Sequence, residues 1–351
     1  MKRTVGLLAF LSLITGCTCP FRSAERDLTQ HVNPFIGAAD NGHTFPGACT
    51  PFGLVQPSPD TGNCTWTYCS GYMYLDETIW GFSQTHLNGT GCPDLGDIQL
   101  QPFTGAIERE NYHSRYKKET QQAHPGYYAV TLDDFGVDVE LTASPRVAFH
   151  RYTFKHAAPA RLLVDLQYGI VSGKEALRKH ILASDVTVED PTTISGHNQA
   201  QAWVKRHYFY VVKFDKPYAA IRQLPAREGE KAPRYVLDFD LKPGDTLQVK
   251  VALSTVSVEG AKKNLAAEIP HWNFMKVRAQ AKAAWNTLLA RAEVEGSLEQ
   301  KENFYTAMYH LFIQPNNIAD VDGQYRGADD KVLTAPGKTY YSTLSLWDTY
   351  R

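Results

Sequence analysis

The sequence lacks an excess of charge of either sign. Its 36 lysine and arginine residues balance 37 aspartate and glutamate residues. A protein that binds nucleic acid or an anionic membrane through its overall field needs a surplus of basic residues. We therefore expect no nucleic-acid partner. The aromatic content of 12% suits either a protein that stacks rings on uncharged ligands or a large β-core.

Long apolar runs are also missing. The longest, Val5–Ile14, follows Lys2 and Arg3 and is too short to span a bilayer, but it has the form of a signal-peptide core. The residues before Cys17 resemble a bacterial lipobox. We expect residues 1–17 to be a signal peptide and Cys17 to be lipidated. The protein would then be an exported bacterial lipoprotein of the periplasm, outer membrane or cell surface, held at a membrane only by its lipid anchor. An ordinary secretory signal with an incidental cysteine is the alternative.

Cysteine is scarce, and its spacing matches no zinc motif, because no second CxxC or matched histidine pair accompanies it. Five cysteines follow Cys17: Cys19, Cys49, Cys64, Cys69 and Cys92. Export permits disulfides, and Cys64 could pair with Cys69 across a turn, but the sequence does not determine the pairing. A free thiol at a binding site is the alternative for Cys69 or Cys92. No metal ligand is assigned from the sequence.

The middle of the chain has the alternating pattern of β-strands. Turn signals such as Asp133–Gly136 and Lys242–Asp245 separate the segments. The expected strands are Tyr127–Leu132, Val137–Leu141, Val147–Phe154, Arg161–Gln167, Gln201–Phe214, Arg234–Leu241 and Thr246–Leu253. Many short strands without interleaved helices favour an antiparallel β-sandwich, expected over residues 28–257.

The period then becomes helical. Glu259–Glu268 and Phe274–Ala292 are expected helices, separated by Pro270. Ser297–Gln300 has the form of a capping box that opens a third helix. We expect Trp285 to be a core residue, as well as Phe304, which shares an apolar face with Met308, Leu311 and Phe312. Residues 258–295 would form a helical linker and residues 296–351 the beginning of an all-helical domain.

Residues 33–97 combine glycine and proline with histidine, aromatic and acidic residues. Backbone that turns sharply while it presents polar and aromatic side chains is typical of a binding site built on loops. A purely structural loop region is the alternative. The density of ring-bearing and hydroxyl-binding side chains favours the binding site.

Several of these segments resemble the signatures of one enzyme family. They read NGHTFPGA, PFGLVQPSPDT, CSGYMYLDETIWGFSQTHLNGTGCPDLGDI, YRGAD and STLSLWDTYR. In this order they resemble the family-92 glycoside hydrolases, which are calcium-dependent, inverting α-mannosidases. The resemblance runs from about Asn33 to Arg351. The sequence departs from the family pattern at Gln84, Asn88 and Pro93.

The resemblance implies a mainly β fold in which the sandwich leads into an (α/α)6 toroid. Such a toroid needs about twelve helices, so we expect this chain to be a fragment that contains only its truncated beginning. The family's general acid and base, and most of its calcium ligands, come from the helical domain beyond residue 351. No catalytic residue is therefore assigned, and the missing C-terminal half is an expected partner.

The resemblance also implies substrate-binding residues. Trp66 corresponds to a tryptophan that contacts the sugar beyond the scissile bond, where an indole can stack on a pyranose. Trp347 and Asp348 belong to the segment that, in the resembling family, recognises the terminal mannose. The carboxylate of Asp348 suits this role, because it can accept hydrogen bonds from two sugar hydroxyls. Arg351 would pair with Asp348 or hold the loop.

His43 and His86 are further candidates for sugar hydroxyls, with buried backbone carbonyls as their alternative partners. Asp94 and Asp97 are expected to brace turns rather than to touch substrate. A core role for Trp66 is the alternative, but its small polar neighbours show no strand alternation.

The expected function is that of an exo-acting α-mannosidase on mannose-containing glycans, such as the α-1,2-linked ends of high-mannose N-glycans, with calcium as cofactor. The fragment alone is expected to be inactive. The rival hypothesis is a non-catalytic carbohydrate-binding sandwich, which a genuine stop after codon 351 would favour. A third and weaker hypothesis is an amidase that releases N-glycans from asparagine, because the sequence shows no nucleophile or acid pair for that reaction.

Overall fold

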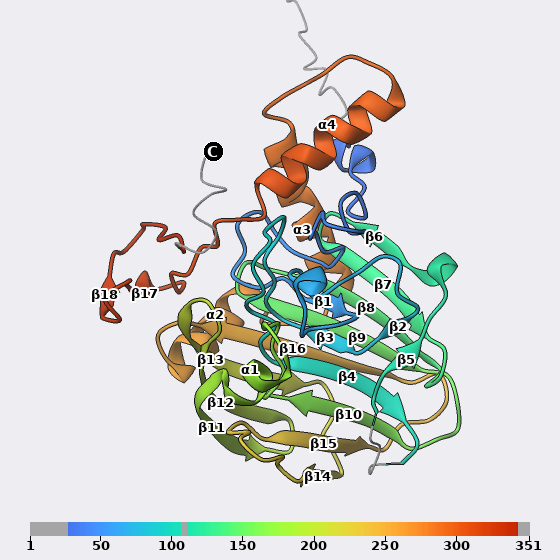
Figure 1. Ribbon diagram of the computed structural model, residues 1–351, viewed down its shortest axis with the longest axis vertical. Coiled ribbons are helices and arrows are strands. Elements are labelled where there is room, and N and C mark those ends of the chain that lie inside the picture. The colour runs from blue at the N-terminus through green and yellow to red at the C-terminus, as the bar shows by residue number, and fades with distance from the viewer. Residues whose placement is uncertain (1–26, 107–110, 343–351) are drawn as a thin grey trace, which may run out of the picture.

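Two antiparallel sheets pack face to face in the computed structural model, which describes residues 27–106 and 111–342 (Figure 1). The six-stranded sheet has the order β1-β3-β4-β10-β15-β14. Its strands are β1 (Ser58–Asp60), β3 (Gly81–Ser83), β4 (Gln99–Thr104), β10 (Ala160–Asp165), β15 (Arg234–Phe239) and β14 (Ala220–Gln223). A crossed order of this kind brings the loops before β4 beside strands that lie far along the chain.

The larger sheet has eight strands in the order β11-β12-β13-β16-β9-β8-β7-β6. They are β11 (Ile181–Asp190), β12 (Thr193–Gln201), β13 (Lys205–Phe214), β16 (Thr246–Ser254), β9 (Val147–Phe154), β8 (Val137–Ala143), β7 (Tyr127–Leu132) and β6 (Gln122–His124). Two short ribbons, β2 (Thr78–Ile79) with β5 (Ser114–Arg115) and β17 (Gln324–Arg326) with β18 (Val332–Thr334), complete the strands. The expected antiparallel β-sandwich is confirmed.

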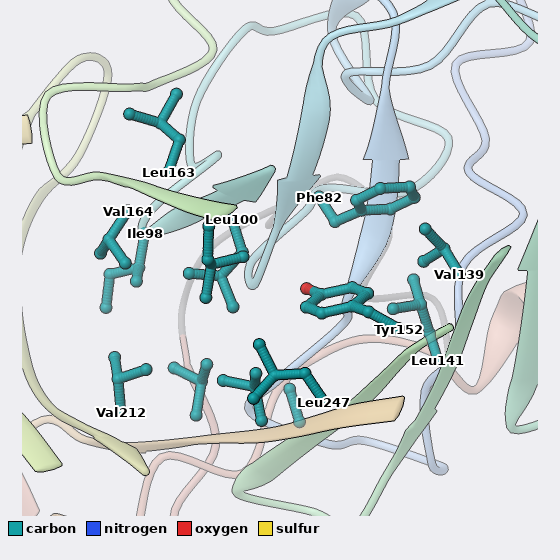
Figure 2. Close-up of a cluster of buried hydrophobic side chains, with 14 of the residues drawn as sticks. Phe82, Ile98, Leu100, Val139, Leu141, Tyr152, Leu163, Val164, Val212 and Leu247 are labelled. Atoms are coloured by element: carbon teal, nitrogen blue, oxygen red, sulfur yellow. The ribbon is translucent and has the colours of Figure 1, made fainter. Parts of the chain in front are cut away.

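The main hydrophobic core lies between the two sheets, because alternate side chains of each strand point inward. Figure 2 shows side chains of both sheets meeting there. The six-stranded sheet contributes Phe82, Leu100 and Val164, and the eight-stranded sheet contributes Val139, Leu141, Tyr152, Val212 and Leu247, all fully buried. Burying one such side chain stabilises the fold by about 2 kcal/mol.

The expected strands match the observed ones closely in the middle of the chain. Two of them, β7 and β9, have the expected bounds. The strands β11 and β12 were not expected. Most side chains of β11, which lies at the sheet edge, are exposed, so the strand carries no alternating apolar pattern.

Two helices cover the outer face of the eight-stranded sheet. They are α2 (Val258–Glu268), capped by Ser257, and α3 (Phe274–Leu289), capped by Asn273. A second apolar cluster joins Phe149 of the sheet to Phe274 and Val277 of α3. The remaining short helices are η1 (Leu28–His31), η2 (Trp66–Tyr68), η3 (Lys118–Thr120) and α1 (Lys174–Lys179).

The third long helix, α4 (Leu298–Leu311), begins at the expected capping box, in which Ser297 and Gln300 bond reciprocally. Its buried residues differ from expectation. Tyr305, Thr306 and Tyr309 face a third cluster, which includes the fully buried Trp285, whereas Phe304 is 36% exposed. The core assignment is confirmed for Trp285 and wrong for Phe304. Tyr305 and Tyr309, on the neighbouring face of α4, pack in the cluster with Trp285 instead.

Candidate functional site

The glycine-rich segment 33–97 runs mainly as loops between the sandwich and α4 (Figure 1). Its N-terminal part is attached to α4. The backbone nitrogen of Asn33 donates to Thr306 Oγ1 (2.9 Å), and its side-chain amide donates to Glu302 Oε1 (2.8 Å). His310 Nε2 lies 3.1 Å from the carbonyl oxygen of Ile36. The loops of segment 33–97 and the helix α4 therefore form one connected loop platform.

Trp66 stands at the start of η2 and is 51% exposed. Its indole Nε1 donates to the carbonyl oxygen of Gly91 (2.8 Å). A Cβ at position 91 would lie 3.1 Å from Nε1, so glycine permits the close approach. The hydrogen bond holds the ring in place while about half of the side chain stays open to solvent, as a stacking surface requires.

His43 lies against this tryptophan. The ring centroids are 4.4 Å apart and the planes cross at 79°. His43 is only 6% exposed, and neither ring nitrogen has a hydrogen-bond partner among the described residues. Burial lowers the pKa of His43, so the ring is neutral near pH 7. A buried polar atom without a partner costs about 1–3 kcal/mol, which marks this ring as a candidate for a ligand contact.

Asn88 adds a third polar group that was not a candidate in the sequence. Its side chain is 6% exposed and its Oδ1 has no partner among the described residues. The adjacent Gly89 nitrogen donates to the carbonyl oxygen of His43 (2.8 Å), which links the two loops. Asn88 is one of the positions at which the sequence departs from the pattern that it resembles, and that departure was the available signal.

His86 is placed differently from His43. It is fully buried, with Nδ1 2.8 Å from the carbonyl oxygen of Gln56 and Nε2 3.0 Å from Asp60 Oδ1 and 3.1 Å from Ser83 Oγ. Both ring nitrogens are thus engaged inside the platform. A sugar hydroxyl could bind His86 only if one of these contacts were released.

Asp94 and Asp97 brace the loop through Arg206 of β13. Arg206 Nε donates to Asp97 Oδ2 (2.9 Å), and its Nη1 contacts Asp94. Burial alone would lower the pKa of Arg206, but the carboxylates of Asp97 and Asp94 outweigh it and raise that pKa. The backbone nitrogen of Val204 also donates to Asp94 (2.8 Å). The structure agrees with the bracing role expected for both aspartates.

The other candidates, Cys17, Trp347, Asp348 and Arg351, lie outside the described residues. The chain just before the last three is attached to the platform, because Asn316 N donates to Ser342 Oγ (3.1 Å) and Asn317 N to the carbonyl oxygen of Phe52 (2.8 Å).

The four described cysteines are free thiols. Cys69 Sγ donates to the carbonyl oxygen of Trp66 (2.9 Å), and Cys64 Sγ donates to Asn63 Oδ1 (2.8 Å). Burial and the neighbouring thiol of Cys92 raise the pKa of Cys69 to about 12, so this thiol is a poor nucleophile at pH 7.

Neither a metal cluster nor a membrane span is found in the described part of the chain. No group of three or more histidine, cysteine or acidic side chains is placed to hold a metal ion there. The carboxylates of Asp94 and Asp97 are engaged with Arg206 rather than open to a cation. These residues do not supply the six to eight oxygen ligands that calcium prefers. No helix in residues 27–106 and 111–342 is long and apolar enough to cross a bilayer.

Both matching family models describe glycosyl hydrolases. The family 92 N-terminal domain matches residues 31–254, and the family 92 catalytic domain matches residues 260–351. The chain therefore belongs to glycosyl hydrolase family 92.

Similar proteins come from bacteria and fungi. An alpha-mannosidase of this family from Bacteroides thetaiotaomicron, also solved with mannoimidazole, is 34% identical with a TM-score of 0.85, covering 93% of this chain and 46% of its own. An inverting mannosidase from the same organism shares the fold at 23% identity and a TM-score of 0.80, covering 92% and 45%. An uncharacterized secreted glycosidase of Arthroderma benhamiae is 25% identical over 364 residues, covering 93% and 46%. The chain spans about half the length of these relatives.

Proposed function

We propose that this chain is the N-terminal part of an exported, exo-acting α-mannosidase and contributes substrate-binding residues to its active site. The single observation that carries the proposal is the neutral, buried imidazole of His43, without a partner among the described residues, beside the half-exposed indole of Trp66. The Bacteroides relative at 34% identity, solved with mannoimidazole, supports mannose as the sugar.

Inverting glycoside hydrolysis requires two carboxyl groups. One protonates the leaving oxygen, and the other activates a water on the opposite face of the ring. We assign neither to this chain. Trp66 would stack on the apolar face of the sugar beyond the scissile bond, and His43 would exchange hydrogen bonds with its hydroxyls. The role of these residues is to hold the leaving sugar so that the two carboxyl groups reach the bond.

Asp348 and Trp347 would recognise the terminal mannose. A carboxylate that accepts from two vicinal hydroxyls distinguishes one epimer from another by geometry. Arg351 would hold the Asp348 loop. In this proposal His86 acts indirectly, since its contacts with Gln56 and Asp60 keep the loops in place.

The finer features of the proposal concern the longer protein. Calcium would be held mainly by residues outside this chain. The preferred substrate would be an α-1,2-linked mannose at the end of a high-mannose N-glycan. Export through residues 1–17 and lipidation at Cys17 would place the enzyme at a bacterial cell surface or in the periplasm, and the secreted fungal relative supports export.

Calorimetric titration with α-1,2-mannobiose tests the binding role. We expect the 351-residue chain to bind it weakly, with a Kd on the order of 1 mM, and Trp66→Ala to weaken binding about tenfold. Trp203→Ala is the matched control, since Trp203 is 43% exposed and lies outside segment 33–97. Its backbone nitrogen, which the substitution keeps, donates to Asp94. An unchanged affinity in Trp66→Ala, or equal losses in both variants, would argue against the proposal.

A further inference from the structure

A cavity of about 580 Å³ lies against the six-stranded sheet. Strand β10 divides its side chains between the two faces of that sheet. Leu163 and Val164 are both buried, and their side chains lie on opposite sides of the strand (Figure 2). By alternation Asp165 shares the side of Leu163, and both residues line the cavity. The cavity therefore opens on the face of the sheet that turns away from the core.

The strand register places a row of polar residues across this face. Asp165 of β10 stands opposite Gln99 of β4 on one side and Arg234 of β15 on the other. Arg234 forms its ion pair with Glu230 (2.6 Å), and no ion pair joins it to Asp165 in the described structure. The carboxylate of Asp165 is thus left facing the cavity beside a neutralised arginine.

Only one of the two carboxylate oxygens of Asp165 accepts hydrogen bonds from described residues. Its Oδ1 accepts from the backbone nitrogens of Gln167 (2.8 Å) and Tyr168 (3.0 Å). Its Oδ2 accepts from no described residue. Two hydrogen bonds on one oxygen fix the carboxylate, so the other oxygen is a preoriented acceptor.

Two further side chains of the cavity wall have a free polar atom, and both are only 4% exposed. Gln99 donates through Nε2 to Asp60 (3.0 Å), and its Oε1 has no partner among the described residues. Asn63 accepts the thiol of Cys64 through Oδ1, and its Nδ2 has no partner there. The cavity wall therefore offers two acceptors, Asp165 Oδ2 and Gln99 Oε1, and one donor, Asn63 Nδ2. Sugar hydroxyls can pair with all three, because a hydroxyl both donates and accepts hydrogen bonds.

Aromatic rings complete the lining. Trp80 and His113 stack with centroids 4.1 Å apart and planes 11° from parallel. Burial lowers the pKa of His113 to about 4, so the stack is uncharged near pH 7. A fixed indole at the edge of this cavity is suited to the apolar face of a pyranose.

The charges of the lining residues cancel. Asp165 and Glu230 balance Arg227 and Arg234. A cavity for a phosphate or a carboxylate would need an excess of positive charge, and one for a cation an excess of negative charge. The balance favours a neutral, hydroxyl-rich ligand.

We propose that this cavity is a second saccharide-binding site, which takes a neutral pyranoside against Trp80 and the free oxygen of Asp165. It would hold a part of a glycan at a site that Trp66 does not line. The proposal does not rest on the function assigned to Trp66.

Fluorine NMR of the 351-residue chain labelled with 5-fluorotryptophan tests both sites at once. The chain has six tryptophans, and Trp66→Phe and Trp80→Phe assign the two relevant resonances. The probes are α-1,2-mannobiose, maltose and cellobiose, each titrated to about 50 mM to cover weak binding. We expect at least one probe to shift the Trp80 resonance, also in the Trp66→Ala variant.

Asp165→Asn should weaken the Trp80 response about tenfold, since the amide presents donors where the carboxylate presented an acceptor. The exposed Asp240, changed to Asn, is the control and should leave the response unaltered. A Trp80 resonance that no probe moves overturns the inference, whatever Trp66 does, as does an undiminished response in folded Asp165→Asn. If Asp165→Asn does not fold, the titration of the unmodified chain decides alone.

Discussion

The imidazole of His43 meets the indole of Trp66 edge-on at 4.4 Å, and both of its nitrogens are buried without a partner among the described residues. Packing alone does not account for this choice of side chain, because an apolar ring would fill the same space without unpaired polar atoms. The pair therefore has the properties of a site that favours ligand binding over stability.

The substitution His43→Phe separates the contribution of His43 to stability from its contribution to ligand binding. The change keeps a ring beside Trp66 and removes the two unpaired nitrogens, which favours the folded state. The backbone of His43 has a φ of 52°, a conformation that phenylalanine tolerates less well than histidine. The free energy of unfolding should therefore change by no more than about 1 kcal/mol. Affinity for α-1,2-mannobiose should fall about tenfold, because one or two hydrogen bonds to the sugar are lost. Urea denaturation and calorimetric titration measure the two effects. A variant that binds normally would remove His43 from the site.

Arg206 is predicted to be the electrostatic support of the loop platform. Its side chain is 6% exposed and bonds two buried carboxylates, so Arg206→Met should lower the free energy of unfolding by about 3–5 kcal/mol. Arg115 is the matched control, with a side chain that is 74% exposed and a single partner, Asp134. Arg115→Ala should cost at most about 1 kcal/mol in the same urea titration. Similar losses for both would show that the buried triad has no special role.

Stability should fall as the pH falls below 6.5, in part because of His150. This histidine is fully buried, and burial lowers its pKa to about 3. Between these two pH values the unfolded chain binds a proton that the folded chain excludes, so stability rises with pH by up to about 1.4 kcal/mol per unit. His150→Gln should flatten this slope in denaturant titrations, while the exposed His156→Gln should not. Equal slopes in all three proteins would contradict the assignment.

The 351-residue chain should self-associate through α4. Phe304 is 36% exposed and Leu311 is 43% exposed, and neither belongs to the buried face of α4 that carries Tyr305 and Tyr309. An exposed apolar face of this kind favours association. Replacing both by Gln should reduce association in sedimentation velocity. Met275→Gln on α3 is the control, because Met275 is 52% exposed and lies outside α4. A chain that sediments as a monomer at all concentrations would show that this face needs no cover.

The sequence predicted the elements in which burial follows a simple period. The strands β7 and β9 and the capping box at Ser297 agree with the structure, because alternation and caps are local signals. Edge strand β11 was missed because solvent faces most of its side chains. Phe304 was predicted wrongly because the sequence alone does not show which aromatic residues of α4 are buried. In the structure Tyr305 and Tyr309 are buried instead.

The candidate site was predictable as a region but not in detail. Glycine, proline and aromatic residues marked segment 33–97, whereas long-range contacts decide which side chains remain available. His43 and His86 could not be distinguished by sequence. In the structure Asp60 and Gln56 occupy the ring nitrogens of His86, while those of His43 have no partner among the described residues. The row of Gln99, Asp165 and Arg234 likewise exists only through strand register.

The proposed function requires that this chain hold part of a mannoside-binding site and that the groups which cleave the bond come from outside it. The most direct test adds 4-nitrophenyl α-mannoside, with and without calcium, to the fluorotryptophan-labelled chain. We predict that the Trp66 resonance shifts with ligand concentration while no nitrophenolate is released. A Trp66 resonance that does not respond, or measurable release of nitrophenolate, would contradict the account.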